Sequence, residues 1–313
     1  NASLYDGASA AAEAALMACR EKRLYKVFVS AGMHPEYIET IETYCHAAGV
    51  EVEVGALNEA GKTAEFPTEK GYAAYMLQSP NFYGVVEDLP LLVEKAHATG
   101  ALAAASCDLI SLALLQRPGD LGVDIVTGEA QALGIPMSFG GPGVGYMAVT
   151  QKLLRKMPGR IAGETVDRDG KTSYVLTIQA REQHIRRERA TSNICTAQAL
   201  MATSATIWLA LMGSSGIRDV AEQSAAKALY LQEKLLATGL FENTYDSPVF
   251  REFALTAKGS LDLNKLNQDL LAEKIFGGLV VDDNRWLLAV TEKKSKQAMD
   301  KFVETVVRLA QAQ

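Results

Sequence analysis

The first part of the chain alternates short apolar runs with segments of helical periodicity. Two runs, YKVFVS (25–30) and VEVEVGA (50–56), are short and rich in β-branched residues, which predicts strands. Between them, apolar residues of the segment 35–49 recur at helical spacing, and Gly49 marks its end. A strand, a helix and a strand in this order predict a βαβ unit with parallel strands.

The same alternation continues beyond this unit. Apolar runs and one helical segment follow as far as residue 130, and a further strand is expected at GVGYMAV. Repeated βαβ units are typical of an α/β domain with a mostly parallel sheet. The segments are AAYMLQS (73–79), a helix over about 88–99, ALAAAS (101–106), DIVTGEA (124–130) and GVGYMAV (143–149).

The pattern changes after the sheet. VDRDGKTSYVLT (166–177) predicts a hairpin closed by an Asp-Gly turn, and the apolar stretch 196–212 predicts a buried helix. From about residue 216 a smaller α+β lobe is expected, so we predict a large domain over 1–215 and a small carboxyl-terminal domain over 216–313. Its elements are helices at 221–239, 263–276 and 297–310 and strands at 248–256 and 284–291.

Composition narrows the class of protein. The 313 residues are 48% hydrophobic and 22% charged, which is typical of a globular chain. The net charge of −6 provides no basic surface for nucleic acid, and no uninterrupted apolar run approaches the roughly 20 residues of a membrane span. We therefore expect neither nucleic acid nor a membrane as a partner. Because the chain opens at Asn1, we also expect that a segment precedes it.

Cysteines and histidines are few and widely spaced. The absence of a CxxC pair argues against a zinc site and against a disulfide framework, and it favours a reducing cytoplasm. The histidines also lack the spacing of metal ligands, so the sequence predicts no metal site. The residues concerned are Cys19, Cys45, Cys107, Cys195, His34, His46, His97 and His184.

Two segments resemble anion-binding loops. The Gly-rich run GGPGVG (140–145) leads into a strand, whereas a dinucleotide-binding loop opens a helix, so no dinucleotide site is expected. Near the start of the chain, an Ala-rich helix presents its amino terminus, where backbone N–H groups could bind an anion. Asp6 precedes this helix as a natural N-cap, and its carboxylate competes for that position. The sequence leaves both possibilities open.

The densest group of charges is REQHIRRERATSNIC (181–195), with four arginines in nine positions. A solvated charged surface is one interpretation. A functional role is favoured because ATSN leads directly into an apolar helix and so places hydroxyl and amide groups at a helix start.

These motifs carry a resemblance to a known family. NASLYDGASAAAEA (1–14), SPNFYGVVED (79–88), GEAQALGIPMSFGGPGVGYMAV (128–149) and REQHIRRERATSNICTAQAL (181–200) resemble the glycine decarboxylase P-protein of the glycine cleavage system. The similarity is to its amino-terminal half, which in many bacteria is a separate chain, glycine dehydrogenase (decarboxylating) subunit 1. The resemblance implies the pyridoxal-phosphate aminotransferase fold (fold type I), with a large, mostly parallel sheet domain and a small α+β domain.

The resemblance also indicates what this chain lacks. In the catalytic half of the family, the loop before an Ile-Pro pair carries the Schiff-base lysine for pyridoxal phosphate, and Gln131 stands at that position. A glutamine amide cannot form an imine. The aspartate that holds the pyridine nitrogen falls at about Ala105, and Asp108, three residues along, is expected to point elsewhere.

The resemblance therefore implies a non-catalytic subunit that completes the active site of a partner. Pyridoxal phosphate is expected on that partner, glycine decarboxylase subunit 2, in a cytoplasmic heterotetramer. The implied reaction decarboxylates glycine and transfers the aminomethyl group to the lipoyl arm of the H-protein. Interface or substrate contacts are expected from Tyr5, Asn81, Thr191, Ser192, Asn193, Arg181, Arg186 and Arg187.

Two alternatives remain open at this stage. The chain could be a scaffold that serves only assembly, in which case the partner would be active alone. It could also be an independent pyridoxal-phosphate enzyme of unusual type.

Overall fold

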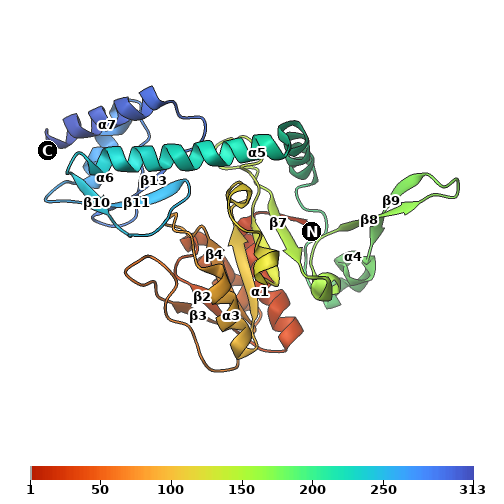
Figure 1. The fold of residues 1–313 in the computed structure, drawn as a ribbon. Helices are drawn as coiled ribbons and strands as arrows, with labels where there is room; N and C mark the ends of the chain where they lie inside the picture. The colour runs from red at the N-terminus through yellow and green to blue at the C-terminus, as the bar shows by residue number, and fades with distance from the viewer. Residues whose placement is uncertain (1) are drawn as a thin grey trace.

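The computed structural model describes residues 2–313. The chain forms a large and a small lobe, each with its own sheet, and a hairpin arm projects from the large lobe (Figure 1). The large sheet has seven strands in the order β1-β7-β6-β5-β4-β2-β3. Its strands are β1 (Ala2–Leu4), β2 (Lys26–Ser30), β3 (Glu51–Gly55), β4 (Ala74–Ser79), β5 (Leu102–Cys107), β6 (Ile125–Glu129) and β7 (Gly145–Val149).

Helices cover both faces of this sheet. On β2, Val27 and Val29 face the cluster formed with α1 (Gly7–Lys22) and α2 (Pro35–Ala47). Phe28 lies between them in sequence and belongs to the opposite cluster, under α3 (Leu89–Thr99). This alternation follows from the two-residue period of a strand.

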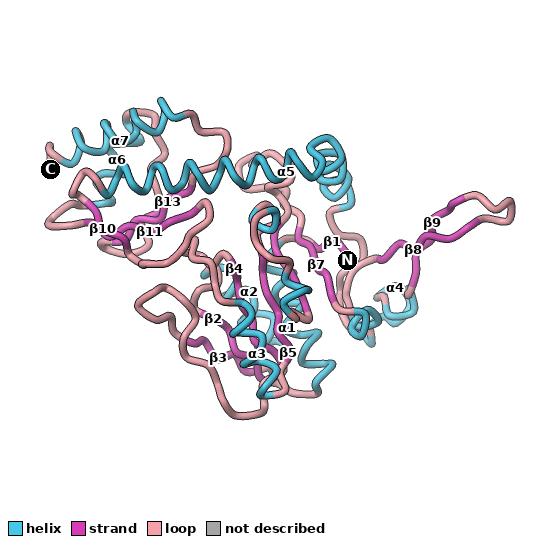
Figure 2. The backbone as a smooth tube through the Cα atoms, viewed as in Figure 1, coloured by secondary structure: helices cyan, strands magenta, loops and turns pink. Residues whose placement is uncertain are grey.

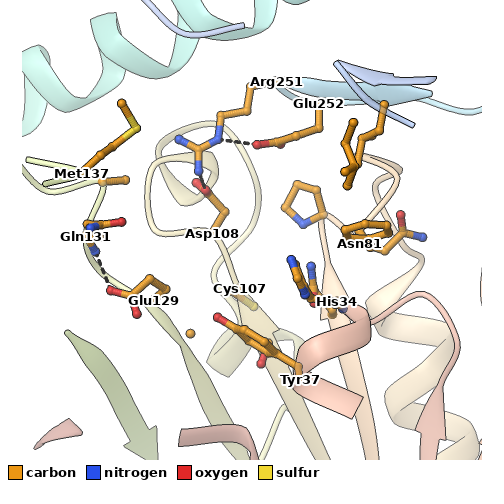
Figure 3. A pocket seen from close by; sticks show the side chains of 18 of the residues that line it. His34, Tyr37, Asn81, Cys107, Asp108, Glu129, Gln131, Met137, Arg251 and Glu252 are labelled. Atoms are coloured by element: carbon orange, nitrogen blue, oxygen red, sulfur yellow. Dashed lines mark hydrogen bonds and ion pairs between the residues drawn. The ribbon is translucent and has the colours of Figure 1, made fainter. Parts of the chain in front are cut away.

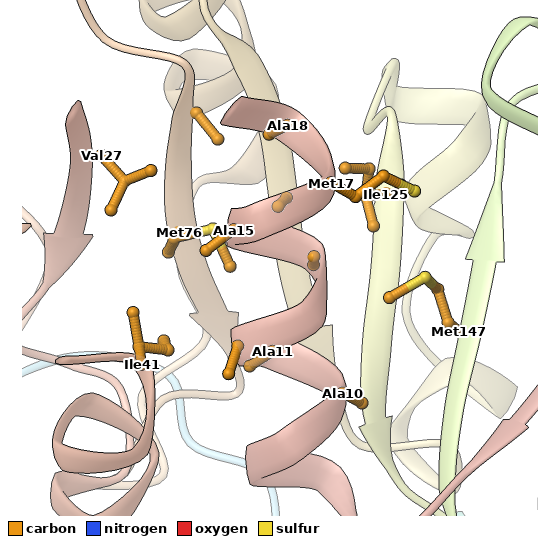
Figure 4. Close-up of a cluster of buried hydrophobic side chains, with 14 of the residues drawn as sticks. Ala10, Ala11, Ala15, Met17, Ala18, Val27, Ile41, Met76, Ile125 and Met147 are labelled. Carbon is orange, nitrogen blue, oxygen red and sulfur yellow. The ribbon is translucent and has the colours of Figure 1, made fainter. Parts of the chain in front are cut away.

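The alanines of α1 explain how closely it lies on the sheet. Ala10, Ala11 and Ala15 are fully buried, and Figure 4 shows α1 lying against the strands that carry Met76 and Met147. Asp6 caps this helix, because its Oδ1 accepts a hydrogen bond from the backbone N–H of Ser9 at 2.7 Å. Such a cap is worth about 1 kcal/mol of helix stability.

The predicted strands and helices of the large lobe are confirmed within a few residues, including the strand that follows the Gly-rich run. Strands β2 to β6 run parallel to one another. Two features were not predicted: β1 is itself a strand, and β7 runs antiparallel to both β6 and β1. Three residues of β1 are too few to show a periodicity.

The arm consists of β8 (Ile161–Val166) and β9 (Thr172–Thr177), as the Asp-Gly turn predicted. It extends away from both lobes in Figure 2, and most of its side chains are exposed. The chain returns through α4 (Gln183–Arg186). Short 3₁₀ helices occupy Ser111–Ala113, Pro118–Leu121, Gln151–Lys156, Gln179–Arg181 and Arg187–Arg189.

The long helix α5 (Ala199–Leu236) connects the lobes and contains a break at Gly213, whose φ is +62°. We expected its first part to be buried, and this is wrong: Leu200, Ile207 and Leu211 are all exposed. An apolar composition alone cannot distinguish a core helix from one that presents its surface to a partner. By length and composition α5 could also cross a membrane, a criterion that core helices of globular proteins meet as well.

The small lobe packs an antiparallel sheet against helices around the buried Trp286. The expected helices and strands are present, together with the short strands β10 and β12. The predicted domain boundary at 215/216 falls inside α5, just after its break, and stays a prediction. The elements are β10 (Phe241–Asn243), β11 (Glu252–Ala257), α6 (Leu263–Ala272), β12 (Leu279–Val280), β13 (Arg285–Ala289) and α7 (Lys296–Ala310).

Candidate functional site

A pocket of about 560 Å³ lies at the carboxyl ends of β4, β5 and β6, where open α/β sheets bind ligands. The large lobe supplies most of its wall, and Arg251 and Glu252 close it from the small lobe (Figure 3). The loop after β2 contributes His34, and α2 contributes Tyr37. The pocket therefore depends on both lobes.

The carboxylate of Glu129 occupies the anion-binding position at the start of α1. Its Oε2 accepts a hydrogen bond from the backbone N–H of Gly7 at 3.1 Å. Its Oε1 accepts from the N–H groups of Gln131, at 2.9 Å, and Val144, at 2.7 Å. Three backbone donors that could hold a phosphate are thus satisfied by a side chain of the chain itself.

Tyr37 lies against the same helix start. A Cβ built on Gly7 would come within 1.8 Å of the Tyr37 hydroxyl oxygen, so only glycine permits this approach. Burial, followed by the charges of Glu129 and Asp6, raises the pKa of Tyr37 above its ordinary value. The Tyr37 phenol therefore stays neutral in the physiological range.

Gln131 lines the pocket, as its position in the resemblance implied. Its side-chain Nε2 donates to the carbonyl oxygen of Pro136 at 3.5 Å, within its own loop. Among the pocket-lining residues in the described part of the chain there is no lysine. The pocket thus offers no amine for covalent attachment of a carbonyl compound.

Asp108 is the carboxylate at the end of β5 that lines the pocket, and its Oδ2 pairs with Arg251. We expected Asp108 to point elsewhere, and this is wrong. Ala105 lies inside β5 and packs in the cluster under α3, so its side chain does not line the pocket. Counting back from the turn therefore placed the pocket-facing position three residues too early in the sequence.

Arg251 sits between two acids. Its Nε donates to Glu252 Oε1 at 3.1 Å while its Nη2 pairs with Asp108. Burial lowers the pKa of Arg251, but the charges of Asp108 and Glu252 more than offset this and raise it. Burial raises the pKa of Glu252, and Arg251 counters this only in part. The Asp108 carboxylate is therefore already engaged by a cation of the chain.

His34 supplies an aromatic wall. Its ring centroid lies 4.9 Å from that of Phe82 in an edge-on arrangement, and its Nδ1 accepts a hydrogen bond from the backbone of Glu36. Burial lowers the pKa of His34, while Glu36 acts in the opposite direction.

Taken together, the residues present do not fit pyridoxal phosphate. The lysine is replaced by Gln131, the helix start is occupied by Glu129 and capped by Asp6, and Asp108 is paired with Arg251. To bind pyridoxal phosphate covalently, the pocket would need a free anion-binding position for the phosphate and an amine for the aldehyde.

Asn81 also lines the pocket, but its side chain is engaged in the loop around it. Its Nδ2 donates to the Gly61 carbonyl and to Glu87, and its Oδ1 accepts from the backbone of Tyr83 and Val85. These bonds give Asn81 a structural function, and any contact with a partner stays a prediction.

The other predicted contact residues lie outside the pocket. Ser192 donates to the buried carboxylate of Glu13 at 2.9 Å, and Arg181 donates to the Gly159 carbonyl at 2.6 Å. Both bonds anchor the segment 181–195 to the large lobe. Their neighbours Arg186, Arg187, Thr191, Asn193 and the more distant Tyr5 are exposed or half-buried.

Sequence reasoning missed the pocket residues Tyr37, Glu129, Arg251 and Glu252. Glu129 follows a strand and precedes the Gln131 loop, which is a position where ligand-binding groups gather. Arg251 and Glu252 gave no such signal, since they belong to the other lobe and reach the pocket only through the fold.

Comparison with known proteins now identifies the family. Residues 1–306 match the model of the glycine cleavage system P-protein family. The chain belongs to this family. It is 48% identical over 309 residues to a probable glycine dehydrogenase (decarboxylating) subunit 1 of Desulforamulus reducens, covering 96% of this chain and 69% of that protein. A protein of the same description from Chlorobium phaeobacteroides is 47% identical, with coverage of 97% and 70%.

Solved structures agree with the sequence comparison. A glycine decarboxylase (P-protein) in inhibitor-bound form superimposes with a TM-score of 0.94 at 37% identity, covering 98% of this chain and 70% of that one. The aspartate aminotransferase of Thermus thermophilus, at 16% identity, matches with a TM-score of 0.66 over 99% of this chain and 84% of that one. The second match concerns the fold alone, and it confirms the expected fold type I architecture.

Proposed function

We propose that this chain is the lysine-lacking, non-catalytic subunit of a cytoplasmic glycine dehydrogenase (decarboxylating). In this proposal it completes the active site of a catalytic partner, glycine decarboxylase subunit 2, which carries the pyridoxal phosphate. The assembled enzyme decarboxylates glycine and transfers the aminomethyl group to the lipoyl arm of the H-protein. The names of the relatives, each a subunit 1, support the existence of a partner.

The single observation that carries the proposal is the position of Glu129. Its carboxylate accepts hydrogen bonds from three backbone N–H groups, that of Gly7 at the start of α1 and those of Gln131 and Val144 in the loop between β6 and β7. It therefore competes directly with a phosphate for these donors. Together with the glutamine at position 131, it favours a partner-borne cofactor over an independent pyridoxal-phosphate enzyme.

Exposed apolar side chains supply the second line of support. The arm exposes Val166 and Tyr174, and the first part of α5 exposes Leu200, Ile207 and Leu211. Several large apolar side chains exposed on one element are typical of an interaction site. A subunit that functions with a partner accounts for them.

The experiment is a reconstitution with the full-length chain. Each subunit is purified alone and the two together, and exchange of the glycine carboxyl group with labelled bicarbonate is measured in the presence of H-protein. We expect carboxyl exchange only when both subunits are present. Of the two subunits purified separately, only the partner should show the visible absorbance of bound cofactor. Exchange by the partner alone would favour an assembly-only scaffold, whereas cofactor absorbance in this chain alone would favour an independent enzyme.

A further inference from the structure

A second group of ionisable side chains lies away from the pocket, where the chain returns from the arm. Glu182 precedes α4, His184 lies in it, and Cys195 lies before α5. The donor atoms of the three side chains all lie within 4.8 Å of one another, and His184 Nδ1 is 3.6 Å from Glu182 Oε2. The fold thus unites a carboxylate, an imidazole and a thiol that are dispersed over fourteen positions of sequence.

The Glu182 carboxylate is an independent sign that this group lacks a partner. Its side chain is only 1% exposed, and neither oxygen accepts a hydrogen bond from any described residue. The nearest cationic groups, on Arg160 and His184, stand 3.6 Å away, beyond hydrogen-bonding distance. Burying a carboxylate without hydrogen bonds is costly, so a missing ligand is expected at this point.

We propose that Glu182, His184 and Cys195 bind a divalent metal ion, with Zn²⁺ as the best match. Oxygen, nitrogen and sulfur are the donors that zinc takes in proteins, and three protein ligands with one open position form a known class of site. Zinc–ligand bonds of about 2.0–2.3 Å place tetrahedral donors roughly 3.3–3.6 Å apart. The Glu182–His184 separation already meets this spacing, and the Cys195 sulfur needs to move by only about 1 Å.

Arg160 is the internal competitor for this site. Its Nη2 donates to Cys195 Sγ at 3.3 Å and its Nε faces Glu182, so its guanidinium stands where the cation would bind. The side chain is 39% exposed and can rotate into solvent. The site therefore alternates between an arginine-occupied and a metal-occupied state.

Metal binding would restrain the segment that follows the arm. A bond network from Glu182 to Cys195 would connect the two ends of the stretch that carries Arg186 and Arg187. Ligation of this kind fixes a loop without a hydrophobic core of its own.

The test measures metal binding to the full chain. Zinc affinity and stoichiometry are measured by competition with a chromophoric chelator, and Co²⁺ replaces zinc to give an absorption spectrum. We expect one zinc ion per chain and a thiolate-to-cobalt charge-transfer band. His184→Ala and Cys195→Ser should each weaken binding by about tenfold or more, and Cys195→Ser should abolish the band.

Two further variants complete the design. His46→Ala, in an exposed histidine of α2 away from the cluster, should bind zinc as the unmodified chain does. Arg160→Ala should bind zinc more tightly, because the competing guanidinium is removed. Substoichiometric binding, unchanged affinity in both ligand variants, or no gain in Arg160→Ala would each overturn the proposal.

Discussion

Replacing Glu129 with alanine tests whether its carboxylate stands in for an anion. The substitution leaves the backbone N–H groups of Gly7, Gln131 and Val144 without their acceptor. Hydrogen bonds to a charged group contribute about 1.5–3 kcal/mol each. Because Glu129 is only half-buried, water can replace part of the lost hydrogen bonding. We therefore expect a loss of about 3–5 kcal/mol in the free energy of unfolding of the large lobe.

The decisive measurement is the response of Glu129→Ala to phosphate. The freed N–H group of Gly7 lies at a helix start, where anions bind, and those of Gln131 and Val144 converge on the same position. Inorganic phosphate should therefore raise the melting temperature of Glu129→Ala relative to chloride at equal ionic strength. The unmodified chain should not respond. Glu94→Ala, which removes an exposed glutamate from α3, serves as the matched control. Equal stability of Glu129→Ala and the control, or an equal phosphate response in all three proteins, would refute the reasoning.

Three further predictions follow from the same structure. Gln131→Lys restores an amine but leaves Glu129 in place, so borohydride reduction after incubation with pyridoxal phosphate should give no stoichiometric adduct; a fully labelled lysine 131 would contradict this. Arg181→Ala should lower the melting temperature, because the half-buried guanidinium of Arg181 donates a hydrogen bond to the Gly159 carbonyl. Arg187→Ala should leave the melting temperature unchanged and impair only the assembled enzyme, and equal melting temperatures of the two variants would argue against this distinction. In the native chain freed of metal, Ellman's reagent should titrate one thiol, that of Cys195. Burial raises the pKa of the other three thiols, to about 11 for Cys19 and about 12 for Cys45 and Cys107, and rapid reaction of more than one thiol would disprove the prediction.

Much of the fold was predictable because the pattern of the sequence is locally consistent. Strands such as β2 alternate between two buried faces. The N-caps Asp6 of α1 and Asp88 of α3, and Gly100 at the end of α3, are visible in the sequence. The first part of α5 shows the limit of this reasoning. Its apolar residues predict that they are buried, and only the structure shows that no other part of the described chain covers them.

The candidate site was predicted less completely. The place of Gln131 in the pocket was predictable from the loop motif, because the family's Schiff-base lysine, whose position Gln131 takes, lies close to that motif in sequence. Arg251 could not be found in this way, because it approaches Asp108 across 143 positions of sequence. The grouping of Glu182 with Cys195 was missed because ligand spacing was sought along the chain, whereas the fold of the segment between them, which contains α4, brings these residues together in space.

The position of Glu129 also bears on how such a protein matures in the cell. A chain that fills the anion-binding position beside α1 with its own carboxylate can complete its large lobe without waiting for a vitamin-derived ligand. Under the proposed function, its yield should be insensitive to vitamin B6 limitation, and it would withdraw none of the scarce cofactor from the catalytic subunits. Under starvation for the vitamin, the pool of ready partners would stay intact and activity would return as soon as the catalytic subunits were loaded.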